Sequence, residues 1–188
     1  RIRMSMRGVG LQEIQSLTLS NERDQFEKTN WNPVSKVTTI SNPISVDHTL
    51  LRQFIFPSLM NILASNRHHE FPQKVYERGE VVHDGENKSR MSWACAELGA
   101  GFSAAKGIVQ SLLRDLGADN SSVSFREVMD GSGPWIVGRG AKVFIGDIEI
   151  GEFGEVSPDV IQSFGIRTPV HGGEFDVGII SDSISDPL

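Results

Sequence analysis

The chain has 188 residues, a formal net charge of −6 at pH 7, 38% hydrophobic residues and 22% charged residues. These values are typical of a globular domain long enough to bury a core, and they exclude an intrinsically disordered chain. The apolar runs are shorter than the ~20 residues that span a bilayer and no secretory leader is visible, so we expect no membrane partner. The single cysteine, Cys95, excludes an intramolecular disulfide and favours a cytoplasmic location.

The charge balance also limits the class of partner. A protein that binds nucleic acid unaided usually presents a basic stripe, whereas the basic residues here are scattered, with the densest group at Arg1, Arg3 and Arg7. We therefore expect any contact with nucleic acid to be local or shared with another subunit. Because Arg1 is not a natural initiator, we also expect the chain to be a piece of a longer protein.

The first part of the chain predicts short elements. Residues 1–8 are typical of the end of a helix that Gly8 and Gly10 stop. Residues 11–19 favour a strand, because apolar and polar residues alternate imperfectly there, and residues 21–28 favour a short polar helix.

The middle of the chain carries stronger signals. A core-facing helical stripe runs over residues 51–63, and Pro57 either kinks this helix or lies in the first turn of a new one. Residues 74–82 predict strands around a turn or bulge at Gly79, and residues 92–98 predict a further strand.

The clearest helix covers residues 102–117. Ser103 is its N-cap candidate, and Gly117 supplies a C-terminal residue that can adopt positive φ. A strand signal follows this helix, and residues 141–156 then predict a hairpin that turns at Gly146-Asp147.

Residues 153–166 combine a strand end, a capped helix and an abrupt stop. Ser157 is the expected cap, Pro158 takes the first helical position and Gly165 ends the helix. Residues 168–180 predict a final strand.

Strands that are near neighbours in sequence, joined by a hairpin and interrupted by helices, predict an α+β fold with a largely antiparallel sheet. We expect residues 1–180 to form one domain and residues 181–188 a polar tail.

No group of residues establishes an active site, and no nucleophile-elbow motif is present. His68-His69-Glu70 lacks a second ligand cluster, so a solvated helix end is favoured over a metal site. Asp47-His48 lacks a partnered nucleophile, and Cys95 is most simply a small buried residue. The glycine-rich segment 99–107 lacks phosphate-loop spacing; segment 131–142 could contact phosphate, although a loop leading into a strand is the stronger interpretation.

The order of several motifs is more specific than any one of them. Residues 41–82, 102–117 and 134–166 resemble, in that order, segments of the β subunit of phenylalanyl-tRNA synthetase. The residues that carry the resemblance are Asn42-Pro43, Leu51-Arg52, Ile55-Phe56-Pro57, Asn66, Tyr76-Glu77-Arg78-Gly79, Phe102, Lys106-Gly107, Leu112-Leu113, Leu116-Gly117, Gly138-Arg139-Gly140-Ala141, Gly151, Gly154-Glu155, Pro158 and Phe164-Gly165-Ile166. It covers about residues 3–178 and is greatest to the archaeal and eukaryotic form.

The resemblance implies a C-terminal catalytic-like module of the β subunit, with the α+β fold of class II synthetases: a mostly antiparallel sheet flanked by helices. In that family the α subunit activates the amino acid, and the two chains form a heterotetramer that charges tRNA(Phe) with phenylalanine using ATP. The implied partners are the α subunit and, through the holoenzyme, tRNA(Phe).

The resemblance also implies that this module has lost catalysis. A class II active site needs an arginine on its motif-two strand and a second at the end of motif three. Arg78 stands in a strand without the usual acidic companion, the helix at residues 159–164 lies at the expected third motif without an arginine, and Arg167 follows only after the glycine stop. Trp135-Ile136-Val137 and Ser157-Pro158 stand where the family has His-Pro, which removes no expected catalytic residue. We therefore expect no catalytic, cofactor-binding or metal-ligating residue here, with ATP and Mg²⁺ bound by the α subunit and by a β domain outside this chain.

The resemblance implies that the N-terminal helix and following strand take the place of the class II dimerisation motif. The candidate subunit interface is therefore Arg3, Arg7, Leu11, Leu17 and Leu19, and ordinary surface arginines remain the alternative for Arg3 and Arg7. Two alternatives remain open: an active ligase or acyltransferase with the class II fold, and a freestanding adaptor that binds RNA or protein.

Overall fold

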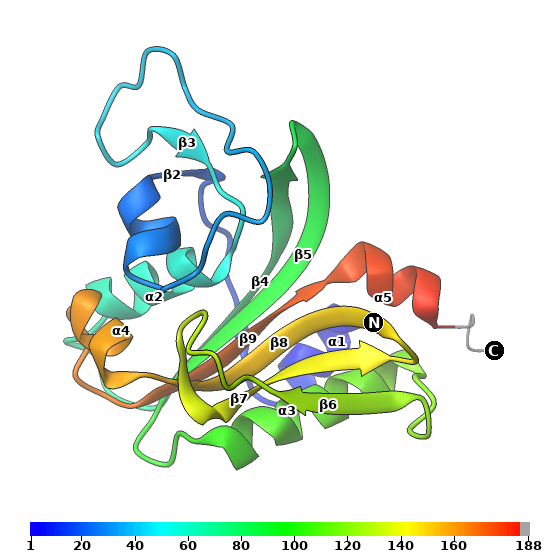
Figure 1. Ribbon diagram of the computed structural model, residues 1–188. Coiled ribbons are helices and arrows are strands. Elements are labelled where there is room, and N and C mark those ends of the chain that lie inside the picture. Colours follow the sequence, from blue (N-terminus) through cyan, green and yellow to red (C-terminus); the bar gives the residue numbers. More distant parts are fainter. Residues whose placement is uncertain (185–188) are drawn as a thin grey trace.

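A computed structural model describes residues 1–184 of the chain (Figure 1). In chain order the elements are α1 (Ile2–Gly8), β1 (Gln12–Glu13), β2 (Leu19–Ser20), the π-helix η1 (Arg23–Glu27), β3 (Leu50–Leu51), α2 (Phe56–Ser65), β4 (Gln73–His83), β5 (Glu86–Ala96), α3 (Phe102–Leu116), β6 (Val123–Glu127), β7 (Trp135–Ile145), β8 (Ile148–Val156), α4 (Pro158–Ser163), β9 (Val170–Asp176) and α5 (Val177–Ser183).

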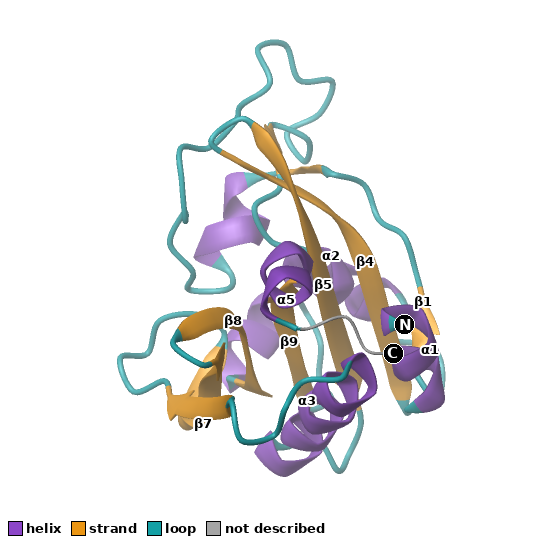
Figure 2. Ribbon diagram, turned by 90° about the vertical axis from the view of Figure 1, so that its right-hand side faces the viewer, coloured by secondary structure: helices purple, strands orange, loops and turns teal. Residues whose placement is uncertain are grey.

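A seven-stranded sheet with the order β1-β4-β5-β9-β8-β7-β6 forms the centre of the fold. Only β1 pairs in parallel, with β4; the other five pairings are antiparallel. The long strands β4 and β5 extend beyond their neighbours (Figure 2). The predicted α+β class with a mostly antiparallel sheet flanked by helices is confirmed.

Each face of the sheet carries its own hydrophobic core. On one face α1, α3 and α5 cover a core that includes Trp93, Phe153 and Phe175. On the other face α2, η1 and α4 cover a core that includes Phe56 and Trp135. The side chains of β4, β5, β8 and β9 therefore alternate between two buried layers, as expected for strands covered on both faces.

Two tight hairpins set the register of the sheet. The β4–β5 turn uses Asp84 (φ 52°) and Gly85 (φ 78°), both in the left-handed region that a two-residue hairpin requires. The predicted turn at Gly146-Asp147 joins β7 and β8, and Gly146 has φ 60°. Local turn chemistry thus fixes which strands are neighbours.

The prediction of a turn or bulge at Gly79 was wrong, because β4 runs without interruption past this residue. A Cβ atom at Gly79 would lie 2.6 Å from Nη2 of Arg52 and 2.8 Å from Oε1 of Glu77. The glycine therefore makes room for a buried arginine that arrives from elsewhere in the chain.

Two helix starts also differ from expectation. The apolar stripe predicted over residues 51–63 belongs to a helix only from Phe56, with Pro57 in the first turn, which confirms the second of the two alternatives for this proline. Ser103 lies inside α3 rather than at its N-cap, which is Gly101 without a side-chain cap. Gly117 ends α3 with φ 92°, as predicted.

The end of the described chain is more helical than predicted. β9 stops at Asp176, whose side chain accepts a hydrogen bond from the Ile179 amide and caps α5. The first part of the predicted tail, through Ser183, is therefore helical, and its last four residues lie outside the described part of the chain. By contrast, α4 has the predicted form: the Ser157 side chain accepts from the Val160 amide, and Gly165, with φ 72°, follows the helix.

The strand predicted over residues 11–19 is only partly formed. β1 and β2 are two residues each, and the stretch between them crosses from one sheet to a separate two-stranded sheet, β2-β3. The longer loop between η1 and β3 projects from the top of the molecule in Figure 1.

Candidate functional site

The sheet face beneath α2 holds a buried ion pair between Arg52 and Glu77. Nη2 of Arg52 lies 2.7 Å from Oε1 of Glu77, and each residue is 1% exposed. The remaining donors of Arg52 reach the Ser16 hydroxyl at 2.7 Å and the Glu80 carbonyl at 3.0 Å. Because a buried ion pair is tolerated only when its other polar atoms are also satisfied, this guanidinium is fully committed to its own chain.

A second ion pair on the same face joins Arg90 of β5 to Glu174 of β9, at 2.9 Å. Glu174 is completely buried, and its carboxylate also accepts the backbone amides of Ile55 and Phe56 at 2.9 and 2.8 Å. These amides open α2, where the helix dipole favours a negative charge. Glu174 therefore anchors the start of α2 to the centre of the sheet.

Aromatic rings fill the space between these ion pairs and the far strands. Trp31 stacks on Phe54 with ring centroids 4.2 Å apart, and Phe56 lies 5.3 Å from Trp135. The rings rest on strand positions that lack side chains: a Cβ atom at Gly172 would lie 2.5 Å from Phe56, and one at Gly140 would lie 2.6 Å from Trp135. Glycines on a sheet permit close approach of another group, and here that group is the protein's own side chain.

Glu152 of β8 lies at the edge of this aromatic cluster. Trp31 Nε1 donates a hydrogen bond to Glu152 Oε1 at 2.5 Å. Burial raises the pKa of Glu152, and the hydrogen bond from the Trp31 indole opposes that rise. The carboxyl group of Glu152 therefore accepts a hydrogen bond from within the protein itself.

Arg78, the arginine that the sequence placed at the second motif, lies on the opposite face of β4 and lines a hollow beside α1 and α5. Within the β4–β5 hairpin, the arginine that lies on the face beneath α2, which we call the filled face, is Arg90, and the sequence analysis missed it. A strand pattern places Arg90 on the same face as Ser92 and Ala94, but only the position of α2 reveals which face that is.

The third-motif candidate does not lie next to the β4–β5 hairpin that carries Arg78. The strand that pairs with β5 is β9, which leads into α5. Residues 153–166 instead end β8 and form α4, one strand further from the hairpin. The helix that follows β9, Val177–Ser183, contains no arginine.

The candidate interface residues fall into two separate surface regions and one core position. Arg3 and Arg7 lie on the exposed side of α1 together with Met4, which is 78% exposed. Arg3 pairs with Glu13 at 2.7 Å. Leu11 is only 4% exposed and packs in the core under α1, so its side chain presents almost no surface.

Leu17 and Leu19 lie away from α1, at the two-stranded sheet. They are 63% and 38% exposed and line a surface hollow with residues of η1 and α2. The structure therefore brings Arg3 and Arg7 together and leaves these two leucines on another part of the surface.

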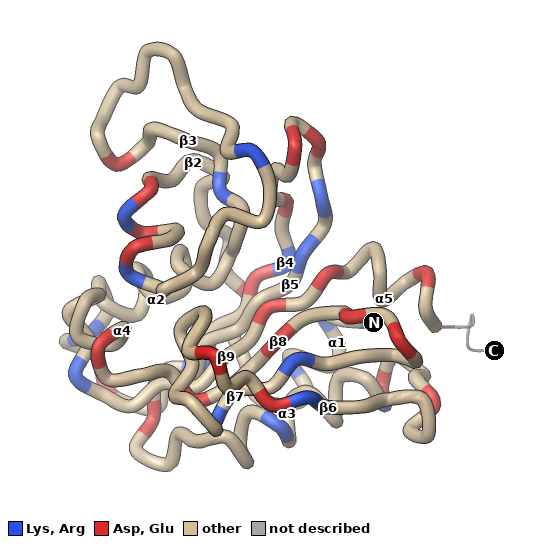
Figure 3. The backbone as a smooth tube through the Cα atoms, in the orientation of Figure 1, with Lys and Arg blue, Asp and Glu red and all other residues tan. Residues whose placement is uncertain are grey.

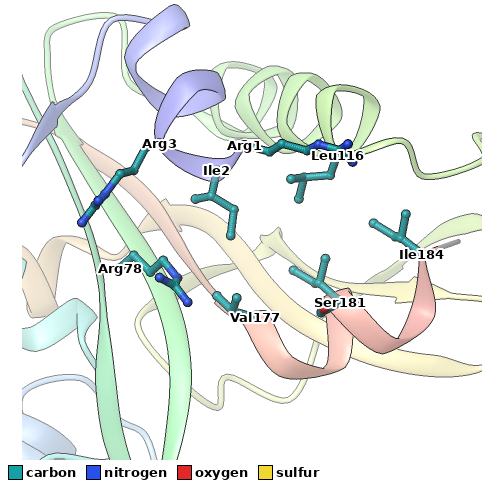
Figure 4. Close-up of a pocket in the computed structure, with 9 residues that line it drawn as sticks. Arg1, Ile2, Arg3, Arg78, Leu116, Val177, Ser181 and Ile184 are labelled. Carbon is teal, nitrogen blue, oxygen red and sulfur yellow. The ribbon is translucent and has the colours of Figure 1, made fainter. Parts of the chain in front are cut away.

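A hollow of about 600 Å³ lies beside the exposed side of α1 (Figure 4). Its walls come from α1, β4, the end of α3 and α5. The lining residues are Arg1, Ile2, Arg3, Arg78, Leu116, Val177, Ile180, Ser181 and Ile184. In Figure 4, Arg3 and Arg78 lie at one side of the hollow and Arg1 lies beside Leu116, and most of the other lining side chains are aliphatic. This lining suits an apolar segment that carries a negative charge.

Cys95, His68 and His69 are the other residues that the sequence analysis considered for chemistry. Cys95 is buried, and burial together with the nearby Glu97 raises the pKa of its thiol to about 12. His68 and His69 are exposed beyond α2, and residues 1–184 contain no group of three potential metal ligands. Within the same range no helix is long and apolar enough to cross a membrane.

The fold defines the class of protein. The pyrrolysyl tRNA synthetase PylSc of Desulfitobacterium hafniense superposes with a TM-score of 0.75, over 98% of this chain and 68% of that one, at 15% sequence identity. The chain thus has the class II aminoacyl-tRNA synthetase fold.

The particular family follows from sequence comparison. A family model described as the phenylalanyl tRNA synthetase beta chain CLM domain matches residues 1–177, and the chain belongs to this family. Phenylalanine–tRNA ligase beta subunits of Methanothrix thermoacetophila and Methanopyrus kandleri are 36% and 37% identical over 95% and 89% of the chain. The chain covers 32% and 29% of those two relatives, about a third of their length.

Proposed function

We propose that this chain is the synthetase-like module of a phenylalanine–tRNA ligase β subunit, and that it supports assembly rather than amino-acid activation. In this proposal a catalytic α subunit charges tRNA(Phe) with phenylalanine and ATP in a cytoplasmic αβ heterotetramer. The observation that supports the proposal is the filled sheet face, where the chain's own arginines are paired with carboxylates and its aromatic rings pack against the strands.

The same observation argues against ATP and Mg²⁺ on this module. Triphosphate binding needs several cationic groups directed at one anion. Arg52 and Arg90 are instead held by Glu77 and Glu174, and the Phe56 ring covers Gly172. We therefore propose that ATP and Mg²⁺ bind elsewhere in the holoenzyme.

The assembly surface in this proposal is the exposed side of α1 with the hollow beside it. Arg3, Met4 and Arg7 supply an apolar side chain between two positive charges. A partner of matching chemistry would offer an apolar segment with acidic residues. Charge reversal at this surface weakens such a contact through like-charge repulsion and loss of complementarity.

The test uses the full-length β subunit co-expressed with its α subunit. We expect Met4→Asp/Arg7→Glu to reduce co-elution of the two chains at least tenfold. The matched control, Gln110→Asp/Arg114→Glu on exposed positions of α3, should leave co-elution within twofold of the unaltered protein. Unchanged assembly in the first variant would move the interface away from α1.

Two measurements address the rival functions. Micromolar binding of ATP, Mg²⁺ and phenylalanine by the full-length β subunit alone, in isothermal titration, would favour an active ligase. Failure of the natural chain to co-purify with any α chain that charges tRNA would favour a freestanding adaptor.

A further inference from the structure

A third surface hollow, of about 650 Å³, lies between the end of α2 and the end of α4. Its lining residues are Leu63, Arg67, His68, Phe71, Ala96, Gln162, Gly165, Ile166, Arg167 and Thr168. We refer to it as the α2–α4 groove. It lies on the opposite side of the sheet from α1, so the proposed assembly surface leaves it open.

The α2–α4 groove is cationic on a chain that is acidic overall. It contains Arg67, His68 and Arg167, and no aspartate or glutamate among its lining residues. Both arginines are exposed, and neither has an ion-pair partner within residues 1–184. This contrasts with arginines such as Arg3 and Arg139, which are paired with carboxylates. Figure 3 shows basic positions beside α4.

Arg67 holds a defined place in the groove. A Cβ atom at Gly165 would lie 3.5 Å from its Nη1 atom, so the guanidinium rests against the turn that ends α4. Gly165 has φ 72°, and 3.5 Å is an ordinary contact distance, so the guanidinium and this turn lie against each other without a clash. Arg67 thus links the two elements that form the walls.

An aromatic side chain and an amide complete the groove. Phe71 is 43% exposed although it is a large apolar residue, and Gln162 adds a neutral group that can both donate and accept hydrogen bonds. Exposed aromatic rings beside arginines are the arrangement that binds single-stranded nucleic acid, because bases stack on rings while cations meet the phosphates.

The groove borders the hollow that Leu17 and Leu19 line. Arg67 and His68 also line this hollow, of about 690 Å³, which contains Arg23 and Lys28 together with Asp24 and Asp47. Lys28 is held by Asp24 at 2.6 Å and lies over the Phe164 ring, whereas Arg23 has no carboxylate partner among the described residues. A chain of phosphates can therefore run from Arg167 past Arg67 toward Arg23.

We propose that the α2–α4 groove binds a single-stranded segment of RNA, with Arg67 and Arg167 on successive phosphates and Phe71 stacked on a base. This goes beyond the proposed assembly function, which needs no RNA contact from this module. A phosphopeptide would match the arginines but would leave the exposed ring and the extended line toward Arg23 without a role.

The experiment uses the assembled αβ holoenzyme and a tRNA(Phe) transcript, with the dissociation constant measured between 50 and 300 mM salt. We expect Arg67→Ala/Arg167→Ala to weaken binding about tenfold. The slope of log affinity against log salt should fall by about 1.4, because each phosphate contact on a single strand contributes about 0.7. Arg114→Ala/Arg126→Ala, on exposed positions of α3 and β6, is the matched control and should change neither quantity.

Phe71 supplies the second readout. Phe71→Ala should weaken RNA binding at least fivefold without altering the salt slope, and Phe71→Tyr should restore it, because stacking needs only an aromatic face. Ultraviolet cross-linking of the unaltered holoenzyme should join RNA to the peptide that contains Phe71.

An unchanged dissociation constant and salt slope in the double arginine variant would overturn the proposal. So would unaltered affinity in Phe71→Ala together with tighter binding of a phosphopeptide than of RNA. Size-exclusion chromatography of each variant separates this result from the assembly proposal. If the groove variants form intact αβ particles and bind RNA as tightly as the unaltered holoenzyme, only the RNA contact is refuted. If no α chain assembles, the assembly proposal fails and the same binding series is run on the full-length β chain.

Discussion

The ring of Phe56 lies directly over Gly172, so that a Cβ atom at this glycine would come within 2.5 Å of Phe56 Cε2 and of the Trp93 carbonyl oxygen. Phe56 opens α2, and Gly172 lies in β9 at the centre of the sheet. The glycine therefore allows the chain to lay the start of α2 directly on the centre of the sheet.

This contact predicts a large effect for Gly172→Ala. The added methyl group meets both a packed ring and a backbone carbonyl, so we expect a loss of about 2–4 kcal/mol in the free energy of unfolding, at or above the usual range for overpacking. Denaturant unfolding monitored by circular dichroism measures it. Gly107→Ala is the control, because nothing lies within 4 Å of that helical position and alanine should stabilise it by up to about 1 kcal/mol. Equal stabilities for the two variants would contradict the close approach of α2.

A second prediction concerns the anchor of α2. Glu174→Ala leaves Arg90 and the amides of Ile55 and Phe56 buried without their acceptor, which should cost about 3–5 kcal/mol. Glu174→Gln keeps an oxygen acceptor and should cost less. Thermal unfolding distinguishes the two variants, and native-state hydrogen exchange should show faster exchange at the start of α2 in Glu174→Ala. Protection there equal to that of the unaltered chain would remove Glu174 from this anchoring role.

A third prediction uses the lone thiol. Because burial and the nearby Glu97 raise the pKa of Cys95 to about 12, less than one thiol in a thousand is ionised at pH 8. We expect no labelling of the Cys95 peptide by iodoacetamide in the native protein over an hour, and complete labelling in guanidinium, as read by peptide mass mapping. Rapid native labelling would mean that this part of β5 opens readily.

Elements with local signals were predictable from the sequence. The cap at Ser157, the stop at Gly165 and the turn at Gly146-Asp147 depend on residues within a few positions of each other, and each has the predicted form. The prediction of a strand through residue 180 was wrong, although the signal that ends the strand is also local. Residues that favour strands lie on both sides of Asp176 and mask its role as the cap that begins α5.

The filled face could not be predicted in the same way, because it is built by contacts between distant segments. Gly79 suggested a turn, yet its role is to admit Arg52, which lies 27 positions earlier in the chain. Arg90 reads as one more strand residue until α2 covers its face of the sheet. Whether Leu11 or Leu17 is exposed likewise depends on where α1 packs, which alternation along one segment does not encode.

The last prediction concerns how the ionisation of Glu152 makes the stability of the fold depend on pH. Burial raises the pKa of this carboxyl in the folded state above its pKa in the unfolded chain. The pKa of an unperturbed glutamate is about 4.3. The folded state therefore binds the proton more tightly, and the stability that this group contributes is complete below about pH 4 and is lost as the pH rises through the folded pKa. Glu152→Gln keeps an oxygen that can accept from Trp31 Nε1 but cannot ionise.

We therefore expect the melting temperature of Glu152→Gln to gain on that of the unaltered protein as the pH is raised from 4 to 8, and the two to converge toward pH 4. Glu22→Gln, at an exposed position away from this cluster, is the control and should show no such pH-dependent gain. A difference between Glu152→Gln and the unaltered protein that stays constant across this range would mean that Glu152 titrates as it does in the unfolded chain. In that case the aromatic cluster of Trp31 and Trp135 does not exclude water from the carboxyl, and the filled face would be more open than these contacts indicate.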